Sequence, residues 1–154
     1  MASPNKWSYI LQVVNDALSA DPTLQVLKAL NRNVQPSPNR LLVYPFLVGG
    51  NQASSNEANR ATDGTMTVRI WTDVAVPLEG ASPTGKSFEA FAKALSMIES
   101  AVSAVEVPQQ ETHADGTTTV IYGFNVTLFG GHVDNGDTKI EADCDVTVSF
   151  RSFR

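Results

Sequence analysis

Residues 65–76 read TMTVRIWTDVAV and alternate between apolar and polar side chains. Successive residues of an extended chain face opposite ways, so the apolar set lies on one side and the polar set on the other. This alternation predicts a strand with one buried face and one exposed face. The inward set is Met66, Val68, Ile70, Val74 and Val76, and the outward set is Thr67, Arg69, Trp71 and Asp73.

Two further strands are predicted toward the C-terminus. Residues 138–150 alternate in the same manner, and residues 118–129 form a strand that we expect to end at the glycines 130–131. Between them the sequence DNGD at 134–137 is a strong turn signal. These last two strands are therefore expected to form an antiparallel hairpin.

Two stretches with apolar residues at helical spacing are predicted to be the main helices. Ser3 and Pro4 are typical of a helix start, and apolar residues then recur at helical spacing over 7–18. A shorter helical stretch is expected over 24–30. The clearest helix covers 87–105, and its apolar stripe suits packing on a sheet or on another helix.

A short strand and a long loop are predicted in the middle of the chain. Residues 41–48 (LLVYPFLV) form the strand, and Pro45 places it at a sheet edge or at a bulge, because proline donates no ladder hydrogen bond. Residues 49–64 carry no apolar side chain larger than alanine. Little there offsets the entropy of ordering, so we expect a mobile loop.

The predicted order is therefore helix, strand, strand, helix, strand, strand, with the whole chain 1–154 forming one domain. This order favours the α+β class, with two layers in which helices pack on one face of a mostly antiparallel sheet.

Composition excludes several classes of protein. The chain has 11 basic and 16 acidic residues and a net charge of −5, which argues against a protein that grips nucleic acid through its phosphates. The single Cys144 allows no intramolecular disulfide, and no apolar run reaches the length of a membrane span. The N-terminus lacks the pattern of a signal peptide.

One motif points to nucleotide binding. Residues 80–87 (GASPTGKS) match the phosphate-binding loop pattern, in which Gly80 and Gly85 shape the loop, Lys86 reaches phosphates and Ser87 ligates Mg²⁺. The preceding strand alternates, however, whereas the strand of a true phosphate-binding loop lies in a parallel sheet and is apolar throughout. A capped surface loop is the favoured interpretation, and no cofactor is expected.

No catalytic or metal-binding constellation is evident. His113 and His132 lie in polar sequence without metal-ligand spacing, and Cys144 is expected to be a packed, inert thiol. Acidic residues cluster near and along the last strand and are interpreted as a solvated or lumenal surface: Asp134, Asp137, Glu141, Asp143 and Asp145.

The elements in this order resemble a known family. The chain begins with an amphipathic helix, followed by the short strand LLVYPFL, a long polar loop and the alternating strand TMTVRIWTDVAVP. The helix KSFEAFAKALSMIESAV and the closing strand CDVTVSFRSF come later. This order of elements resembles the tail terminator, or tail completion, proteins of long-tailed bacteriophages of the lambda type. The strand at 118–129 is additional to the family's pattern. The family has no catalytic motif, so the resemblance implies a structural, non-enzymatic protein.

The resemblance implies a homo-oligomeric ring, usually of six subunits, that caps the tail tube and stops its polymerisation. The expected partners are further copies of the chain, the tail tube protein and a neck or head-completion protein. DNA passes through the ring without specific binding, no membrane is involved, and the location is the virion tail after assembly in the host cytoplasm.

Within such a ring, two surfaces are expected to matter. Glu141, Asp143 and Asp145 would line the lumen and repel DNA phosphates. The long loop would be ordered by a neighbouring subunit, through Gly49, Gly50, Asn51, Asn59, Arg60, Asp63 and Gly64. Deleting 49–64 is then expected to leave the fold but abolish assembly.

Three alternatives remain open at this stage. A tail tube or head–tail connector protein belongs to the same class, although a tube subunit is expected to have less helix near its N-terminus. A small nucleotide-binding protein rests on 80–87 alone. A general α+β interaction module fits as well.

Overall fold

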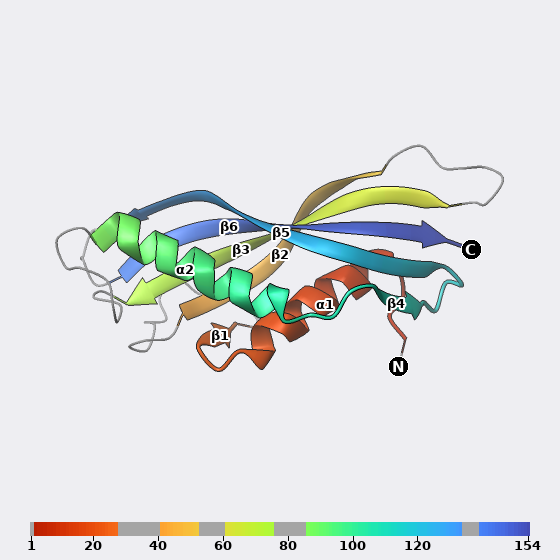
Figure 1. The fold of residues 1–154 in the computed structure, drawn as a ribbon, viewed down its shortest axis with the longest axis horizontal. Coiled ribbons are helices and arrows are strands. Elements are labelled where there is room, and N and C mark those ends of the chain that lie inside the picture. The colour runs from red at the N-terminus through yellow and green to blue at the C-terminus, as the bar shows by residue number, and fades with distance from the viewer. Residues whose placement is uncertain (1, 28–40, 53–60, 76–85, 134–138) are drawn as a thin grey trace.

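The computed structural model describes residues 2–27, 41–52, 61–75, 86–133 and 139–154 (Figure 1). Two helices and six strands follow one another in these ranges, and the α+β class is confirmed. Their bounds are α1 Lys6–Ala20, β1 Leu24–Val26, β2 Leu41–Gln52, β3 Thr62–Ala75, α2 Lys86–Ser103, β4 Gln109–Thr112, β5 Thr118–Val133 and β6 Lys139–Phe153.

The strands form one six-stranded sheet in the order β1-β2-β3-β6-β5-β4. All neighbours are antiparallel except β1 and β2, which run parallel. The predicted hairpin of β5 and β6 is confirmed, with a register that runs from Thr118 opposite Phe153 to Val133 opposite Ile140. Figure 1 shows the long strands crossing near the middle of the view and fanning apart toward both ends, as strongly twisted strands do.

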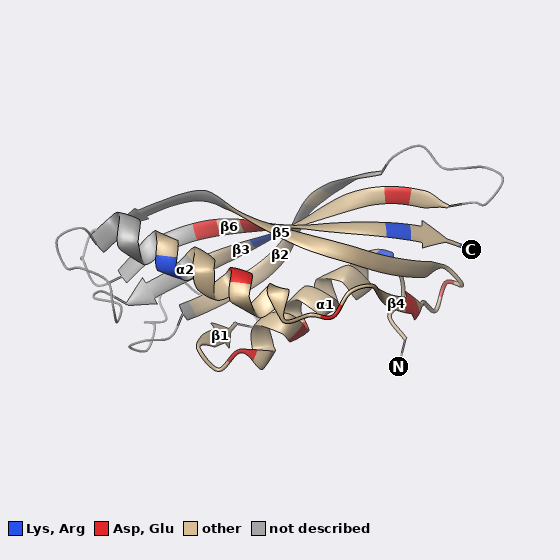
Figure 2. Ribbon diagram, viewed as in Figure 1, with Lys and Arg blue, Asp and Glu red and all other residues tan. Residues whose placement is uncertain are grey.

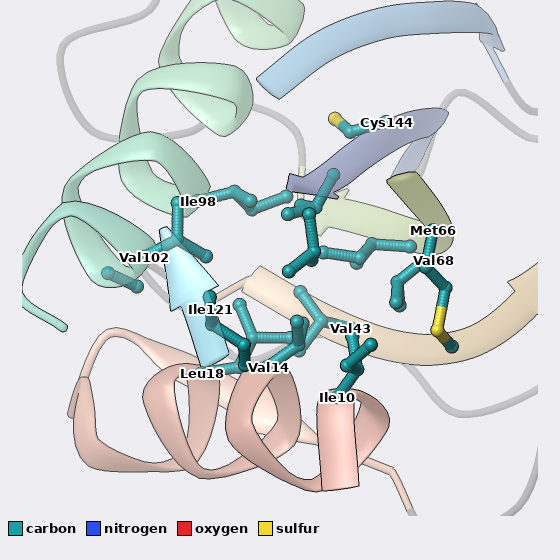
Figure 3. Packing of buried hydrophobic residues seen from close by; sticks show 14 of the residues in the cluster. Ile10, Val14, Leu18, Val43, Met66, Val68, Ile98, Val102, Ile121 and Cys144 are labelled. Carbon is teal, nitrogen blue, oxygen red and sulfur yellow. The ribbon is translucent and has the colours of Figure 1, made fainter. Parts of the chain in front are cut away.

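The buried core joins residues of both helices to inward residues of the sheet (Figure 3). Ile10, Val14 and Leu18 of α1 and Ile98 and Val102 of α2 are almost completely buried. They share one cluster with the predicted inward residues of β3 and with alternate residues of β6, namely Met66, Val68, Ile70, Cys144, Val146, Val148 and Phe150. Val74 and Val76 have side chains outside the described part of the chain.

The strands β2 and β3 are longer than the sequence indicated. The loop predicted over 49–64 is too long at both ends, because β2 continues to Gln52 and β3 already starts at Thr62. A register shift between Leu47 and Gly49 lets the polar continuation of β2 stay paired with β3. Backbone hydrogen bonding to the neighbouring strands thus extends β2 and β3 into segments whose side chains show no apolar alternation.

The end of β5 was also predicted too early. The glycines 130–131 do not end the strand, which continues to Val133. The register shifts between Ile121 and Gly123 and again between Leu128 and Gly130, so β5 carries an extra residue at each place and stays paired with β6. Glycine at the second shift therefore marks an irregularity within the strand.

The stretch from 24 onward is not helical where it is described. Leu24–Val26 forms β1, which pairs in parallel with β2. The Asp21 carboxylate accepts hydrogen bonds from the backbone N–H and the hydroxyl of Thr23, which fixes a turn directly after α1. Pairing across the sheet thus overrides helical spacing in this short segment. Residues 28–30 lie outside the described ranges.

Two smaller boundaries differ as well. The cap of α1 is Asn5, whose Oδ1 accepts the backbone N–H of Ser8 at 3.0 Å, so the helix starts later than the Ser3-Pro4 signal suggested. The polar stretch after α2 contains β4, a strand that was not predicted. Pro45 lies beyond the three residues of β2 that pair with β1, and the predicted edge position is thereby confirmed among the described strands.

We expect Ile98→Ala to lower the free energy of unfolding by about 2–5 kcal/mol, because it removes a fully buried side chain between α2 and the sheet and leaves a cavity. Urea unfolding followed by circular dichroism measures this. The control is Glu99→Ala, the exposed neighbour on the same helix, for which a change within about 0.5 kcal/mol is expected. Equal effects of the two substitutions would contradict the packing described above.

Candidate functional site

The outward residues of β2, β3 and β6 form a continuous surface, which we call the outer face. It carries the side chains that alternate with the core residues of the same strands. Three of them, Tyr44, Phe46 and Trp71, form a cross-strand aromatic cluster with ring centroids 5.0 to 6.5 Å apart. All three are partly exposed. Such clusters combine large contact area with defined geometry, which suits a contact surface.

An ion pair crosses the outer face beside these rings. The Arg69 Nε donates to Asp145 Oδ1 at 2.8 Å, and its Nη2 donates to Oδ2 at 3.2 Å. This two-pronged contact with Asp145 raises the pKa of Arg69, and the nearby Asp143 adds to the effect. Figure 2 shows acidic and basic segments side by side on β3 and β6.

The predicted lumen residues are only partly brought together. Asp143 and Asp145 lie on the same face of β6, opposite Trp71 and Arg69 of β3. Glu141 continues this register, and its side chain lies outside the described part. Because Arg69 pairs with Asp145, this surface is not the uniformly acidic strip that the sequence suggested. The sequence of β6 alone does not show this, because Arg69 belongs to the neighbouring strand β3.

A second ion pair lies at the far end of the same two strands. Arg151 donates to both carboxylate oxygens of Asp63, at 2.6 and 2.9 Å, and both side chains are about half exposed. Hydrogen bonding to Arg151 lowers the pKa of Asp63 below its usual range. An exposed pair of this kind fixes geometry more than it adds stability.

Most of the residues expected in the interface loop lie in strands. Gly49, Gly50 and Asn51 of β2 are paired with β3, and Asp63 and Gly64 of β3 are paired with β6. Asn59 and Arg60 lie outside the described ranges. Deleting 49–64 would remove paired strand residues and so would disturb the fold, which makes it an unsuitable test of assembly.

The phosphate-binding motif has only its last two residues inside the described ranges. Lys86 and Ser87 begin α2, whereas Gly80 and Gly85 precede the described segment. The strand before the motif, β3, is antiparallel to both of its neighbours. A phosphate-binding loop follows a strand of a parallel sheet, so the topology disfavours nucleotide binding at this position.

A buried polar network around His113 was not predicted. The His113 side chain is completely buried, its Nε2 shares a hydrogen bond of 2.7 Å with Thr119 Oγ1, and its Nδ1 lies 3.3 Å from Glu111 Oε1. The same Glu111 oxygen accepts the backbone N–H of Ser3 at 2.6 Å. An acid, a histidine and a hydroxyl thus lie in line, but Thr119 is completely buried and offers no access to a substrate. The network fastens the N-terminal segment to the turn between β4 and β5.

Two clefts flank α1. One, of about 590 Å³, lies between α1 and residues 104–111 and is lined mainly by polar side chains, among them Tyr9, Gln12, Asp16 and Gln109. The other, of about 530 Å³, lies between α1 and the β1–β2 edge, with Leu11, Asn15 and Tyr44 in its wall. Neither was predicted, because each forms from segments far apart in the sequence.

Cys144 is a packed thiol, as predicted. It is completely buried, and burial raises its pKa to about 12, with Asp143 and Asp145 adding to the rise. Within the described ranges no three His, Cys, Asp or Glu side chains gather closely enough to hold a metal ion. Over the same ranges neither helix has the length and apolar character needed to span a membrane.

Comparison with protein-family models gives no match, and comparison with curated proteins gives none either.

We expect Glu111→Gln to reduce the loss of stability in acid. Burial alone would raise the pKa of Glu111, but hydrogen bonds from Ser3 and His113 outweigh it and hold the pKa below its ordinary value of 4.5. The folded state thus favours the ionised form, so its contribution is present above pH 4.5 and is lost as the pH falls through the lower folded pKa.

Urea unfolding at several pH values between 7 and 3 tests this expectation. The gap in unfolding free energy between the natural protein and Glu111→Gln should be largest near neutral pH and should shrink in acid. Gln110→Ala, an exposed change on the same strand, removes no ionisable group and serves as the control. A gap that is constant across the range would show that Glu111 is not preferentially ionised in the folded state.

Proposed function

We propose that this protein is a structural subunit of a bacteriophage tail, a tail terminator that forms a ring on the end of the tail tube. In this proposal the ring stops tube polymerisation and joins the tail to a neck or head-completion protein, and DNA passes through its centre. In the same proposal the fold has two layers, with both helices on one face of the sheet. The protein acts by assembly and has no enzymatic role.

The observation that carries the proposal is the outer face. Both helices contribute their buried side chains to the core on the opposite side of β3 and β6. The outer face instead presents the aromatic cluster, two arginine–carboxylate pairs and small polar residues along long strands. Aromatic and arginine side chains are enriched in protein interfaces, and an extended surface of this kind suits contact with another subunit.

The two edges of the sheet give a second reason. β2 beyond Val43 and β5 beyond Ile121 have a strand neighbour on one side only, among the described residues. These edges lie on opposite sides of the strand order. Contact between two different edges of successive subunits is heterologous, and such a contact closes into a ring when the rotation between subunits divides a full turn.

Negative-stain microscopy and light scattering of the concentrated protein test ring formation. We expect closed rings with a central hole, either from the protein alone or on the ends of tail tubes assembled from the tube protein. Adding the protein to polymerising tubes should shorten them. Open stacks of unlimited length would indicate a tube subunit instead, and a monomer that leaves tube length unchanged would contradict the proposal.

The orientation of the outer face in the ring has its own test. If Asp143 borders the lumen beside the contact with a neighbouring subunit, Asp143→Lys should give rings that bind double-stranded DNA at low salt, because it places cations along the path of the phosphates. Glu99→Lys, on the exposed side of α2, makes the same change in charge outside the lumen. A mobility-shift assay compares the two, and equal binding by both would place Asp143 away from the lumen.

A further inference from the structure

The cleft between α1 and residues 104–111 contains polar atoms that lack partners. Tyr9 is 5% exposed, lines this cleft, and its hydroxyl has no hydrogen-bond partner in the described part of the chain. The Oε1 atom of Gln109, from the same wall, is buried and equally without a partner. A buried polar atom without a partner destabilises the folded protein, so the cleft is suited to a group that supplies the missing hydrogen bonds.

The hydrogen-bonding capacity of these atoms defines what they bind. The amide oxygen of Gln109 accepts only, so its partner must be a donor. The Tyr9 hydroxyl can donate or accept, and burial together with the charge of Glu111 raises its pKa above the ordinary value of 10.0. A ligand with several N–H donors meets both atoms.

The charge of the lining has one sign. Asp16 of α1, Glu106 after α2 and Glu111 of β4 line the cleft, and no lysine or arginine does so among the described residues. Asp16 is held in place by Gln12, whose Nε2 donates to its Oδ1 at 2.6 Å. A cation is therefore favoured over an anion or a neutral group.

We propose that this cleft binds a guanidinium group, with the Tyr9 hydroxyl and Gln109 Oε1 accepting its N–H donors and the surrounding carboxylates balancing its charge. A guanidinium presents five donors in one plane and is weakly hydrated, so a single group can donate to more than one acceptor. The group comes either from a free small molecule or from an arginine side chain of another protein chain. This site is independent of the proposed ring, because Tyr9 lies on α1 and Gln109 lies on β4, away from the outer face.

Titration of the whole protein with three probes tests the site, by nuclear magnetic resonance of the backbone and glutamine amides. Agmatine represents a free guanidinium, N-acetyl-arginine-methylamide an arginine side chain, and N-acetyl-citrulline-methylamide a neutral molecule of the same shape. We expect at least one cationic probe to bind with a Kd of about 1 mM or lower, with shifts centred on 104–111. The citrulline probe should bind at least about tenfold more weakly, because it lacks the charge.

The two cationic probes separate the sources. Binding of agmatine as tightly as the arginine derivative indicates a free small molecule as a sufficient ligand. Binding of the arginine derivative alone indicates a side chain of a partner protein. Either result supports a guanidinium site. Absence of binding by both would show that the cleft binds no guanidinium, and equal binding of the citrulline probe would show that the positive charge is not recognised. Either result would overturn the proposal.

Substitutions locate the contact. Tyr9→Phe keeps the ring against His113, whose centroid is 5.1 Å away, and removes only the hydroxyl. It should weaken binding by about 2- to 10-fold. Because the hydroxyl has no partner among the described residues, the same change should leave the urea midpoint equal or higher. Lower affinity without lower stability is a combination that a purely structural role does not produce.

The contribution of the carboxylates that line the cleft is tested with a matched pair of substitutions. Glu106→Gln, which lines the cleft, should weaken binding of the cationic probe by about 2- to 5-fold. Glu99→Gln removes the same charge from an exposed position of α2 that does not line the cleft, and it should leave the affinity unchanged. Equal weakening by both substitutions would reveal non-specific attraction to the acidic protein and would contradict a defined site.

Discussion

The rest of the structure depends on the pairing of β3 with a long antiparallel strand on each side. β2 and β6 hold β3 along most of its length, so its alternation becomes the alternation of the sheet. Once Met66, Val68 and Ile70 point to one side, the helices have a single apolar surface on which to bury their stripes. The opposite side then collects the arginine, carboxylate and aromatic side chains. Core and outer face are thus two results of one register.

Much of this architecture is visible in the sequence where side chains alternate strictly. Residues 65–76 and the final hairpin are strands as predicted, apart from their bounds, and the predicted inward residues whose side chains are described are buried, Cys144 included. The signal failed where backbone pairing decides the structure. Leu24–Val26 resembles a helix but pairs with β2, and the polar ends of β2 and β3 carry no apolar pattern although they belong to the ladder.

The sites were less predictable than the fold, because they join residues that are distant in sequence. Arg69 and Asp145 each appeared as an outward residue of its own strand, and only the register between β3 and β6 makes them a pair. Ser3, Glu111 and Thr119 meet around His113 because the N-terminal segment crosses the β4–β5 turn. The unpartnered hydroxyl of Tyr9 is a property of packing, which alternation cannot encode.

The two tryptophans lie on opposite sides of the sheet, which gives the protein two separate optical reporters. Trp7 packs edge-on against Phe150 with ring centroids 5.9 Å apart, next to the buried core. Trp71 packs against Phe46 on the outer face and is partly exposed to water. Its emission responds when another molecule covers that face, whereas the emission of Trp7 responds when the core opens. Replacing one indole at a time therefore separates association from denaturation in a single fluorescence experiment.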